Sequence, residues 1–173
     1  MNLAFIISSL SKVISPVIYR IARMTVYRKL SPEVKWEEAK LLTMEEFSAL
    51  LDKYPYRSDY LFGLVDFTIE EPELFFTQNR SYNRDCDDFA QMWLLWAREN
   101  GLEAWKVYIA DGLSIKSAHA FTIILKNDRF YLCNLSLHGH YSSIEEAVSR
   151  FEHEELVEHG RYRDLKWAVR DYY

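Results

Sequence analysis

The chain of 173 residues has few of the features that define several common protein classes. Its two cysteines, Cys86 and Cys133, form no Cys-x-x-Cys pair and cannot build a disulfide framework. Two free thiols in a reducing, cytoplasmic compartment are the simpler expectation, and one Cys86–Cys133 bond is the alternative. No uncharged apolar run reaches the roughly 18 residues of a membrane span, because Lys12 interrupts the first one. We find no internal repeat and no low-complexity linker.

An excess of positive charge is also absent. The chain has 21 basic and 26 acidic residues and a net charge of -5, so nucleic acid is not expected as a partner. Its residues are 49% hydrophobic and 16% aromatic, which indicates a well-packed globule rather than a disordered chain. The length suits one domain with a terminal appendage.

The first 30 residues are expected to form that appendage, and residues 31–173 the domain. Apolar residues of the segment 1–29 recur at helical spacing, with serines and basic residues on the other side, which predicts an amphipathic helix. No basic stretch precedes the apolar start, so a signal peptide is not favoured. The helix either packs on the domain or binds a membrane surface or a protein partner. Its basic residues are Lys12, Arg20, Arg23, Arg28 and Lys29.

The stretch at residues 83–101, which has polar ends and an apolar middle, predicts a central helix. After its first turn it is apolar on both sides and is interrupted only by Gln91, a pattern typical of a buried helix. Asp85 or Cys86 can cap its start, and Gly101 supplies a left-handed end. Cys86 is therefore expected in the first turn of a buried helix.

The other elements follow from capping signals and periodicity. A capping box at residues 43–46 begins an amphipathic helix, and Pro72 is a suitable first residue for a short one. After residue 101 the pattern changes to that of strands. We expect strands at 103–110, 118–126 and 130–135, a helix from a second capping box at Ser143, and a last strand around Trp167. This order predicts an α+β fold in which the central helix packs on an antiparallel sheet.

The turn between the second and third of these strands decides which side chains share a face. A two-residue turn at 127–128 places Asn134 on the same side of the sheet as His119. A three-residue loop would reverse the parity and present Cys133 instead. His119 is the only histidine inside an apolar strand, so it is the candidate base for a cysteine nucleophile.

The position of Cys86 has opposing effects on its thiol. Unpaired N–H groups at a helix start favour the thiolate, whereas the three neighbouring aspartates disfavour it. An imidazolium partner would be needed to favour the thiolate. The alternative is that Cys86 is an inert, buried residue.

Several short runs carry a family resemblance. They are Asp-Cys-Asp-Asp-Phe-Ala at 85–90, Glu-Asn-Gly-Leu at 99–102 before a strand, His-Ala-Phe at 119–121 and Tyr-Leu-Cys-Asn-Leu at 131–135. In this order they resemble the transglutaminase-like superfamily, and most closely the bacterial transglutaminase-like cysteine peptidases. The resemblance covers about residues 75–140. It implies a papain-like core, with Cys at the start of the central helix, His on the following sheet and Asp or Asn on the next strand.

The resemblance also implies residue roles: Cys86 as nucleophile and His119 as general base and acid. The third position is usually Asp in that family, and either Cys133 or Asn134 aligns with it. The parity of the two-residue turn favours Asn134 and a Cys-His-Asn triad. The family often has a glycine before the Asp-Cys pair, where this chain has Arg84.

The implied reaction is acyl transfer on an amide or peptide bond of a protein or peptide substrate, without a cofactor. Hydrolysis is favoured over transfer to an amine, because water is always present. The oxyanion would be held by the Cys86 backbone N–H and by Gln78 or Asn83, between which the spacing does not decide.

Two other hypotheses compete with this enzyme. Cys133, His138 and His140 lie close enough in sequence to suggest a metal site, but Gly139 indicates a loop and no known ligand spacing is present. The acidic residues around Cys86 are explained by helix capping rather than by calcium. The second alternative is a non-catalytic papain-like module that binds a membrane or an assembly through its N-terminal helix.

Overall fold

A computed structural model describes residues 32–57, 71–77, 84–111, 118–154 and 165–172. Its elements are α2 (Trp36–Ala39), α3 (Met44–Leu51), α5 (Pro72–Phe75), α6 (Cys86–Glu99), β1 (Glu103–Asp111), β2 (Ala118–Lys126), β3 (Arg129–Cys133), β4 (Leu137–Tyr141), α7 (Ile144–Glu154) and β5 (Leu165–Tyr172). The expected amphipathic helix over 1–29 lies outside the described residues. Its packing, and its contacts with a membrane or partner, stay predictions.

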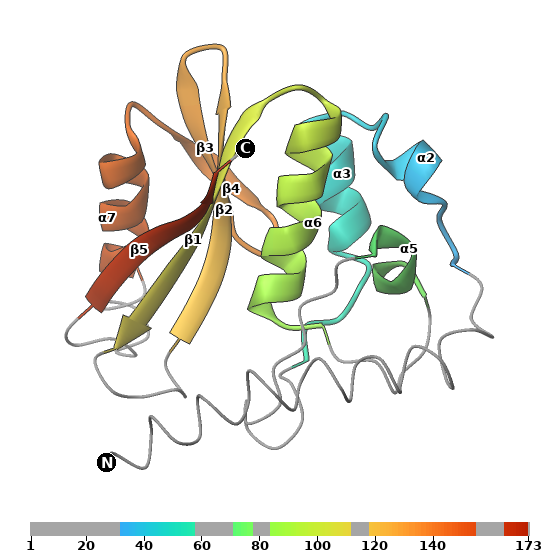
Figure 1. Cartoon of the computed structure of the whole chain (residues 1–173), viewed down its shortest axis with the longest axis horizontal. Helices are drawn as coiled ribbons and strands as arrows, with labels where there is room; N and C mark the ends of the chain where they lie inside the picture. Colours follow the sequence, from blue (N-terminus) through green and yellow to red (C-terminus); the bar gives the residue numbers. More distant parts are fainter. Residues whose placement is uncertain (1–31, 58–70, 78–83, 112–117, 155–164, 173) are drawn as a thin grey trace.

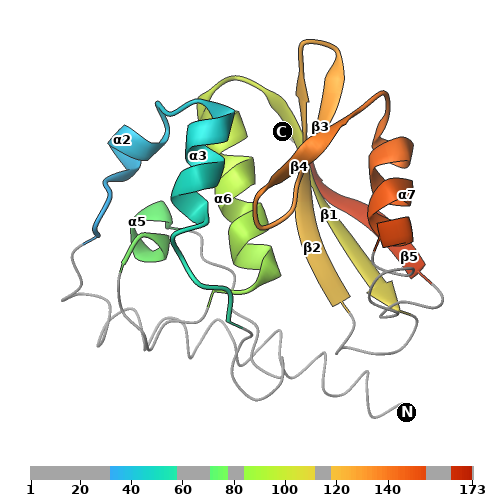
Figure 2. The same cartoon turned by 180° about the vertical axis from the view of Figure 1, so that it is seen from behind.

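The strands form one antiparallel sheet in the order β4-β3-β2-β1-β5. Helix α6 lies against one face, with α2, α3 and α5 beyond it, and α7 covers the other face (Figures 1 and 2). The predicted α+β class, with a central helix packed on an antiparallel sheet, is confirmed.

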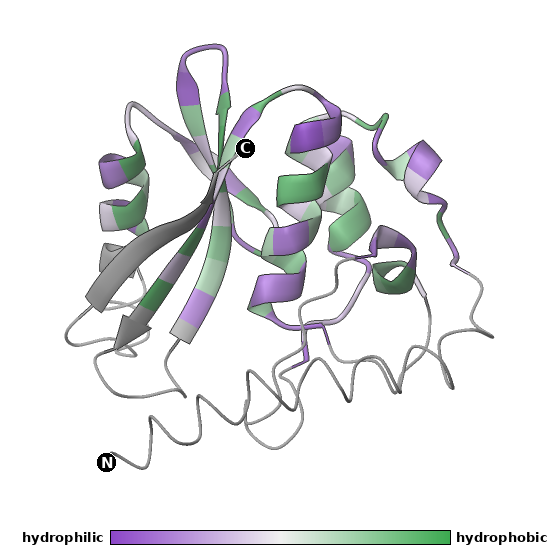
Figure 3. Cartoon of the chain, viewed as in Figure 1, coloured by the Kyte–Doolittle hydropathy of each residue, from purple (hydrophilic) through white to green (hydrophobic). Residues whose placement is uncertain are grey.

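Helix α6 begins and ends at the predicted signals. Asp85 is its N-cap, and its side chain accepts a hydrogen bond from the N–H of Asp87 at 3.3 Å. Gly101, with φ +66°, reverses the chain after the last turn in the left-handed region that glycine enters at little cost. In Figure 3, α6 is hydrophilic at its start and at its end, and the apolar part between them is broken by one hydrophilic band.

The turn between β2 and β3 has two residues, as predicted. Lys126 pairs with Arg129 across it, and Asn127 and Asp128 have φ values of 52° and 57°. Two successive residues at positive φ define the tight hairpin turn whose twist matches that of the strands. The parity on which the choice of Asn134 depends is therefore present.

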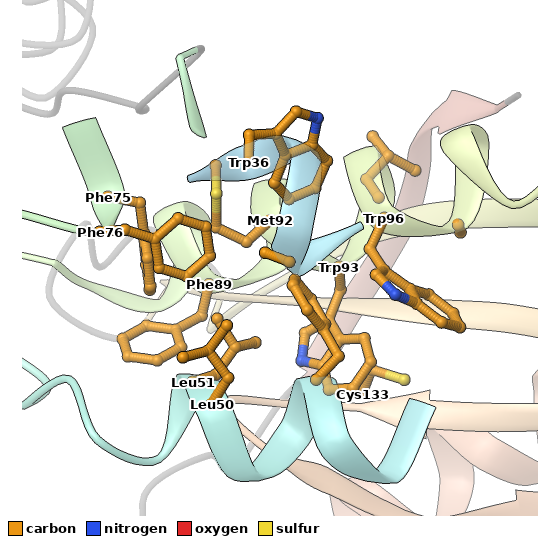
Figure 4. Close-up of a cluster of buried hydrophobic side chains, with 14 of the residues drawn as sticks. Trp36, Leu50, Leu51, Phe75, Phe76, Phe89, Met92, Trp93, Trp96 and Cys133 are labelled. Carbon is orange, nitrogen blue, oxygen red and sulfur yellow. The ribbon is translucent and has the colours of Figure 1, made fainter. Parts of the chain in front are cut away.

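The two faces of the sheet carry separate cores. The α6-side core is largely aromatic and joins the helices to the sheet through Ala104, Ile124 and Cys133 (Figure 4). Its aromatic members are Trp36, Phe47, Tyr54, Phe75, Phe76, Phe89, Trp93 and Trp96. The α7-side core consists of Val107, Ile109, Phe121, Ile123, Leu132, Ala147, Val148 and Phe151. Residues of β1, β2 and β3 alternate between these cores, as a pleated strand requires.

Three expectations need correction. Residues 137–141, where we read Gly139 as part of a loop, form strand β4, with His138 and His140 exposed. An edge strand with this exposure has no apolar alternation by which to recognise it. The third strand ends at residue 133 rather than 135. At the start of α7, Ser143 accepts the N–H of Glu146, but the carboxylate of Glu146 binds Ser142 instead of completing the predicted box.

Candidate active site

Cys86 is the first residue of α6, is half-buried and forms no disulfide with Cys133. The turn around it is fixed by its neighbours, because the side chain of Asp88 accepts the N–H of Asp85 at 3.2 Å while Asp85 caps the helix. Asp87 and Asp88 are buried, so carboxylates close to the thiol are partly shielded from water. Helix capping accounts for the carboxylates of Asp85 and Asp88, as expected.

His119 and Asn134 lie together on the sheet. The Nε2 atom of His119 is 2.7 Å from the Oδ1 atom of Asn134, which is only 8% exposed. A buried amide oxygen at this distance accepts the Nε2–H and thereby fixes the imidazole tautomer. Nδ1 is then the basic nitrogen of the neutral ring.

Cys133 is placed differently, although it was the rival for the third position. Its side chain points to the opposite face of the sheet and is fully buried in the α6-side core, where the sulfur is 3.8 Å from the carbonyl oxygen of Tyr131. Burial raises the pKa of the Cys133 thiol well above its usual value. Cys133 is therefore an inert core thiol that does not orient His119.

The His119 ring lies on the α7 side of the sheet. It stacks on Phe151 of α7, with ring centroids 5.3 Å apart and planes 6° apart, and it also contacts Phe121. Helix α6 packs on the other side, where the hydroxyl of Thr122 donates to the carbonyl of Ala90 at 2.7 Å. The helix of Cys86 and the ring of His119 thus lie on opposite faces of the sheet.

The two residues nevertheless lie at the same level of the molecule. Helix α6 and strand β2 start at the same end and run in the same direction (Figures 1 and 2). Measured from the Thr122–Ala90 hydrogen bond, Cys86 is one turn earlier, about 6 Å, and His119 three strand residues earlier, about 10 Å. His119 is the second residue of β2, so it lies near the end of the sheet at which α6 begins, with its ring on the α7 face.

Gln78 and Asn83, the candidate oxyanion donors, lie outside the described residues. Among the described residues, no group of three or more His, Cys, Asp or Glu side chains is arranged to hold a metal ion. His138 and His140 are exposed on β4 whereas Cys133 is fully buried, so the structure does not bring these three residues together as a metal site.

Two buried basic side chains were not anticipated from the sequence. Arg84, two residues before Cys86, is 3% exposed, and Lys106 on β1 is 1% exposed beneath α6. Lys106 donates to Gln91 at 3.4 Å and lies 5.2 Å from the ring centroid of Tyr108. Gln91 is the single polar residue in the apolar run. Its presence on a buried helix could have predicted a polar partner on the sheet.

Comparison of the chain with protein-family models, curated proteins and solved structures gives no match. In the ranges that the structure describes, none of the helices combines the length and apolar character needed to cross a bilayer.

Proposed function

We propose that this protein catalyses cysteine-dependent acyl transfer on an amide or peptide bond, with hydrolysis as the overall reaction. Cys86 is the nucleophile, His119 the general base and acid, and Asn134 the residue that orients the imidazole. The observation that carries the proposal is the 2.7 Å contact between His119 Nε2 and Asn134 Oδ1, at the end of the sheet where the helix of Cys86 begins.

A papain-like core belongs to the same proposal. It is supported by the order of the elements, in which a helix starting at Cys86 is followed by antiparallel strands that carry first His119 and then Asn134. The resemblance of the runs at 85–90, 119–121 and 131–135 to the bacterial transglutaminase-like cysteine peptidases agrees with this order.

In this mechanism, Nδ1 of His119 takes the proton of the Cys86 thiol while Asn134 accepts the Nε2–H. The thiolate attacks the amide carbonyl, forming a C–S bond and an oxyanion. His119 then donates the proton to the leaving amine as the C–N bond breaks, which leaves a thioester on Cys86. Water, deprotonated by His119, attacks the thioester, and the C–S bond breaks to release a carboxylic acid and the thiol.

The acidic surroundings of Cys86 make the imidazolium essential to this scheme. Asp85, Asp87 and Asp88 oppose the formation of a negative charge on the sulfur, whereas the helix start favours it. A protonated imidazole close to the sulfur supplies the remaining stabilisation of the thiolate. Removal of His119 should therefore abolish thiol reactivity rather than only slow proton transfer.

A second candidate is a non-catalytic papain-like module. It is favoured by the stacking of the His119 ring on Phe151, on the face of the sheet that α6 does not cover. In this alternative, the hydrogen bond to Asn134 satisfies a half-buried histidine and has no chemical role. A thiol at a helix start then requires no imidazole partner.

Labelling with a thiol-reactive amide probe separates the two candidates. We expect the probe to modify Cys86, and labelling to be lost in His119→Ala and in Cys86→Ser. His138→Ala, which removes an exposed histidine from β4, is the matched control and should label like the wild type. Equal labelling of the wild type and His119→Ala would sink the enzyme proposal and leave the binding module.

A further inference from the structure

Arg84 is buried just before the helix of Cys86, with its guanidinium group enclosed by α5 and the chain that follows α3. Its Nε donates to the carbonyl of Phe75 at 2.7 Å, and its Nη2 donates to the carbonyl of Thr77. The guanidinium carbon lies 5.0 Å from the ring centroid of Tyr54 and 5.4 Å from that of Phe75. The group is thus held by two hydrogen bonds in its plane and by two aromatic rings.

These contacts explain how a guanidinium is accommodated with 3% exposure. A buried charge is costly unless it is hydrogen-bonded, and here the acceptors are carbonyls at the end of α5, where a helix presents its partial negative charge. Aromatic faces add a cation–π attraction. The planar guanidinium of arginine donates to both carbonyls while it contacts both rings. The single ammonium of lysine cannot make all four contacts at once.

The backbone of Arg84 adds a second contact with the chain after α3. Its carbonyl accepts the N–H of Arg57 at 2.8 Å, so the chain after α3 is bonded to the chain before α6. Arg84 therefore connects three helical regions at a point two residues from the thiol of Cys86.

We propose that Arg84 is a positioning residue for Cys86. Its side chain fixes the first turn of α6 relative to α5, and with it the direction of the thiol and of the backbone N–H at the helix start. The catalytic part of this inference, that Arg84 aligns a nucleophile, rests on the proposed function. Arg84 stands where the resembling family often has glycine, and in this proposal it aligns the nucleophile.

The test compares Arg84→Lys with a core variant that is destabilised elsewhere. Arg84→Lys keeps the charge but loses the fork, and Met44→Ala removes a buried side chain at the far end of α3 without touching α6's first turn. Three quantities are measured on the full chain: the melting temperature, hydrogen exchange of the amides at 85–90, and the rate of labelling by the amide probe. Met44→Ala shows how a loss of stability alone changes the hydrogen exchange and the labelling rate.

We expect exchange at 85–90 to rise about tenfold and probe labelling to fall about tenfold in Arg84→Lys, each change equivalent to about 1.4 kcal/mol. Met44→Ala, at an equal or larger loss of melting temperature, should leave both at wild-type values. Wild-type exchange in Arg84→Lys, or equal changes in the two variants, would overturn the positioning role.

The outcome for Arg84 is separable from that of the proposed function. Should labelling of the wild type be independent of His119, the enzyme proposal fails, and the exchange at 85–90 still decides whether Arg84 fixes the first turn. Should labelling depend on His119 while Arg84→Lys behaves as the wild type, the enzyme proposal stands and the inference on Arg84 fails.

Discussion

His119 and Asn134 are 15 residues apart in the chain, and their side chains meet at 2.7 Å on the α7 face of the sheet. The contact follows from the register of one hairpin, in which residue 122 opposes 133 and residue 134 is carried past the end of β3. The imidazole is held on one side by this amide and on the other by the ring of Phe151. Its orientation therefore depends on both the hairpin and α7.

Replacing Asn134 should affect catalysis more than replacing Cys133. Asn134→Ala removes the acceptor of the Nε2–H and frees the ring to rotate, so we expect amide hydrolysis to fall about tenfold or more. Asn134→Asp keeps an acceptor and should lose less. Cys133→Ala, measured in parallel by initial rates, should stay close to the wild type, and the reverse ranking would show that the orienting residue has been misassigned.

The two thiols should differ sharply in accessibility. Cys86 is half-buried at a helix start, whereas Cys133 is fully buried and has a raised pKa because of that burial. Iodoacetamide at neutral pH should therefore add one group to the folded chain, at Cys86, and a second only after denaturation. Intact-mass and peptide mass spectrometry give the count and the position. Modification of Cys133 in the native protein would contradict the core assignment.

Two helix-start carboxylates should make the fold sensitive to acid. The backbone N–H of Thr43 lowers the pKa of Glu46, and the hydroxyl and N–H of Ser142 lower that of Glu146. The folded pKa values lie below the unfolded value, so this stability is present above about pH 4.5 and is lost as the pH falls through the folded values. Unfolding of Glu46→Gln and Glu146→Gln, followed from about pH 6 to about pH 3, should show a smaller acid-induced loss than the wild type. Equal losses in all three proteins would count against these caps.

Lys106 should be replaceable without loss of stability. Its ammonium is buried with one amide acceptor at 3.4 Å and one aromatic ring, and no carboxylate of the described residues pairs with it. A buried charge with so little compensation is often exchanged for an apolar group of similar volume at a gain of about 1 kcal/mol. Lys106→Met should therefore be neutral or stabilising in chemical denaturation, with exposed Lys53→Met as control. A loss above about 2 kcal/mol would reveal a partner that the ammonium requires.

Asp128 occupies a backbone conformation better suited to glycine. Its φ of 57° is disfavoured for a residue with a Cβ, although aspartate tolerates it better than most. We expect Asp128→Gly to stabilise the hairpin by about 0.5–1 kcal/mol. Asp52→Gly, at the end of α3 where φ is -59°, is the matched control and should give no gain. Destabilisation by Asp128→Gly would mean that its side chain contributes more than the strain costs.

Capping and periodicity predicted most of the described fold. The capping box of Thr43, the positions of Asp85 and Gly101, Pro72 at the start of α5 and the two-residue turn at 127–128 are all present. These signals are local, because each concerns hydrogen bonds or backbone angles within a few residues. Strand β4 was missed because it is an exposed edge strand, which local patterns describe poorly.

The candidate site was predictable only in part. Strand parity was enough to place His119 beside Asn134 and to separate Cys133 from them, since parity is a local count. Which face of the sheet α6 would cover was not predictable, because it depends on how α7 and α6 divide the two faces. The burial of Arg84 and Lys106 was also missed, since long basic side chains are usually exposed and their partners here come from distant segments.

The two-residue connection between β2 and β3 constrains how this chain can diverge. Exchanging its side chains changes only the local strain, but a shift of β3 along β2 by one residue would turn each later side chain to the opposite face of the sheet. Asn134 would then turn toward α6, and a thiol would take its place next to the imidazole. Homologues with the proposed chemistry should therefore keep the pairing of residues 126 and 129, whatever the side chains of the turn.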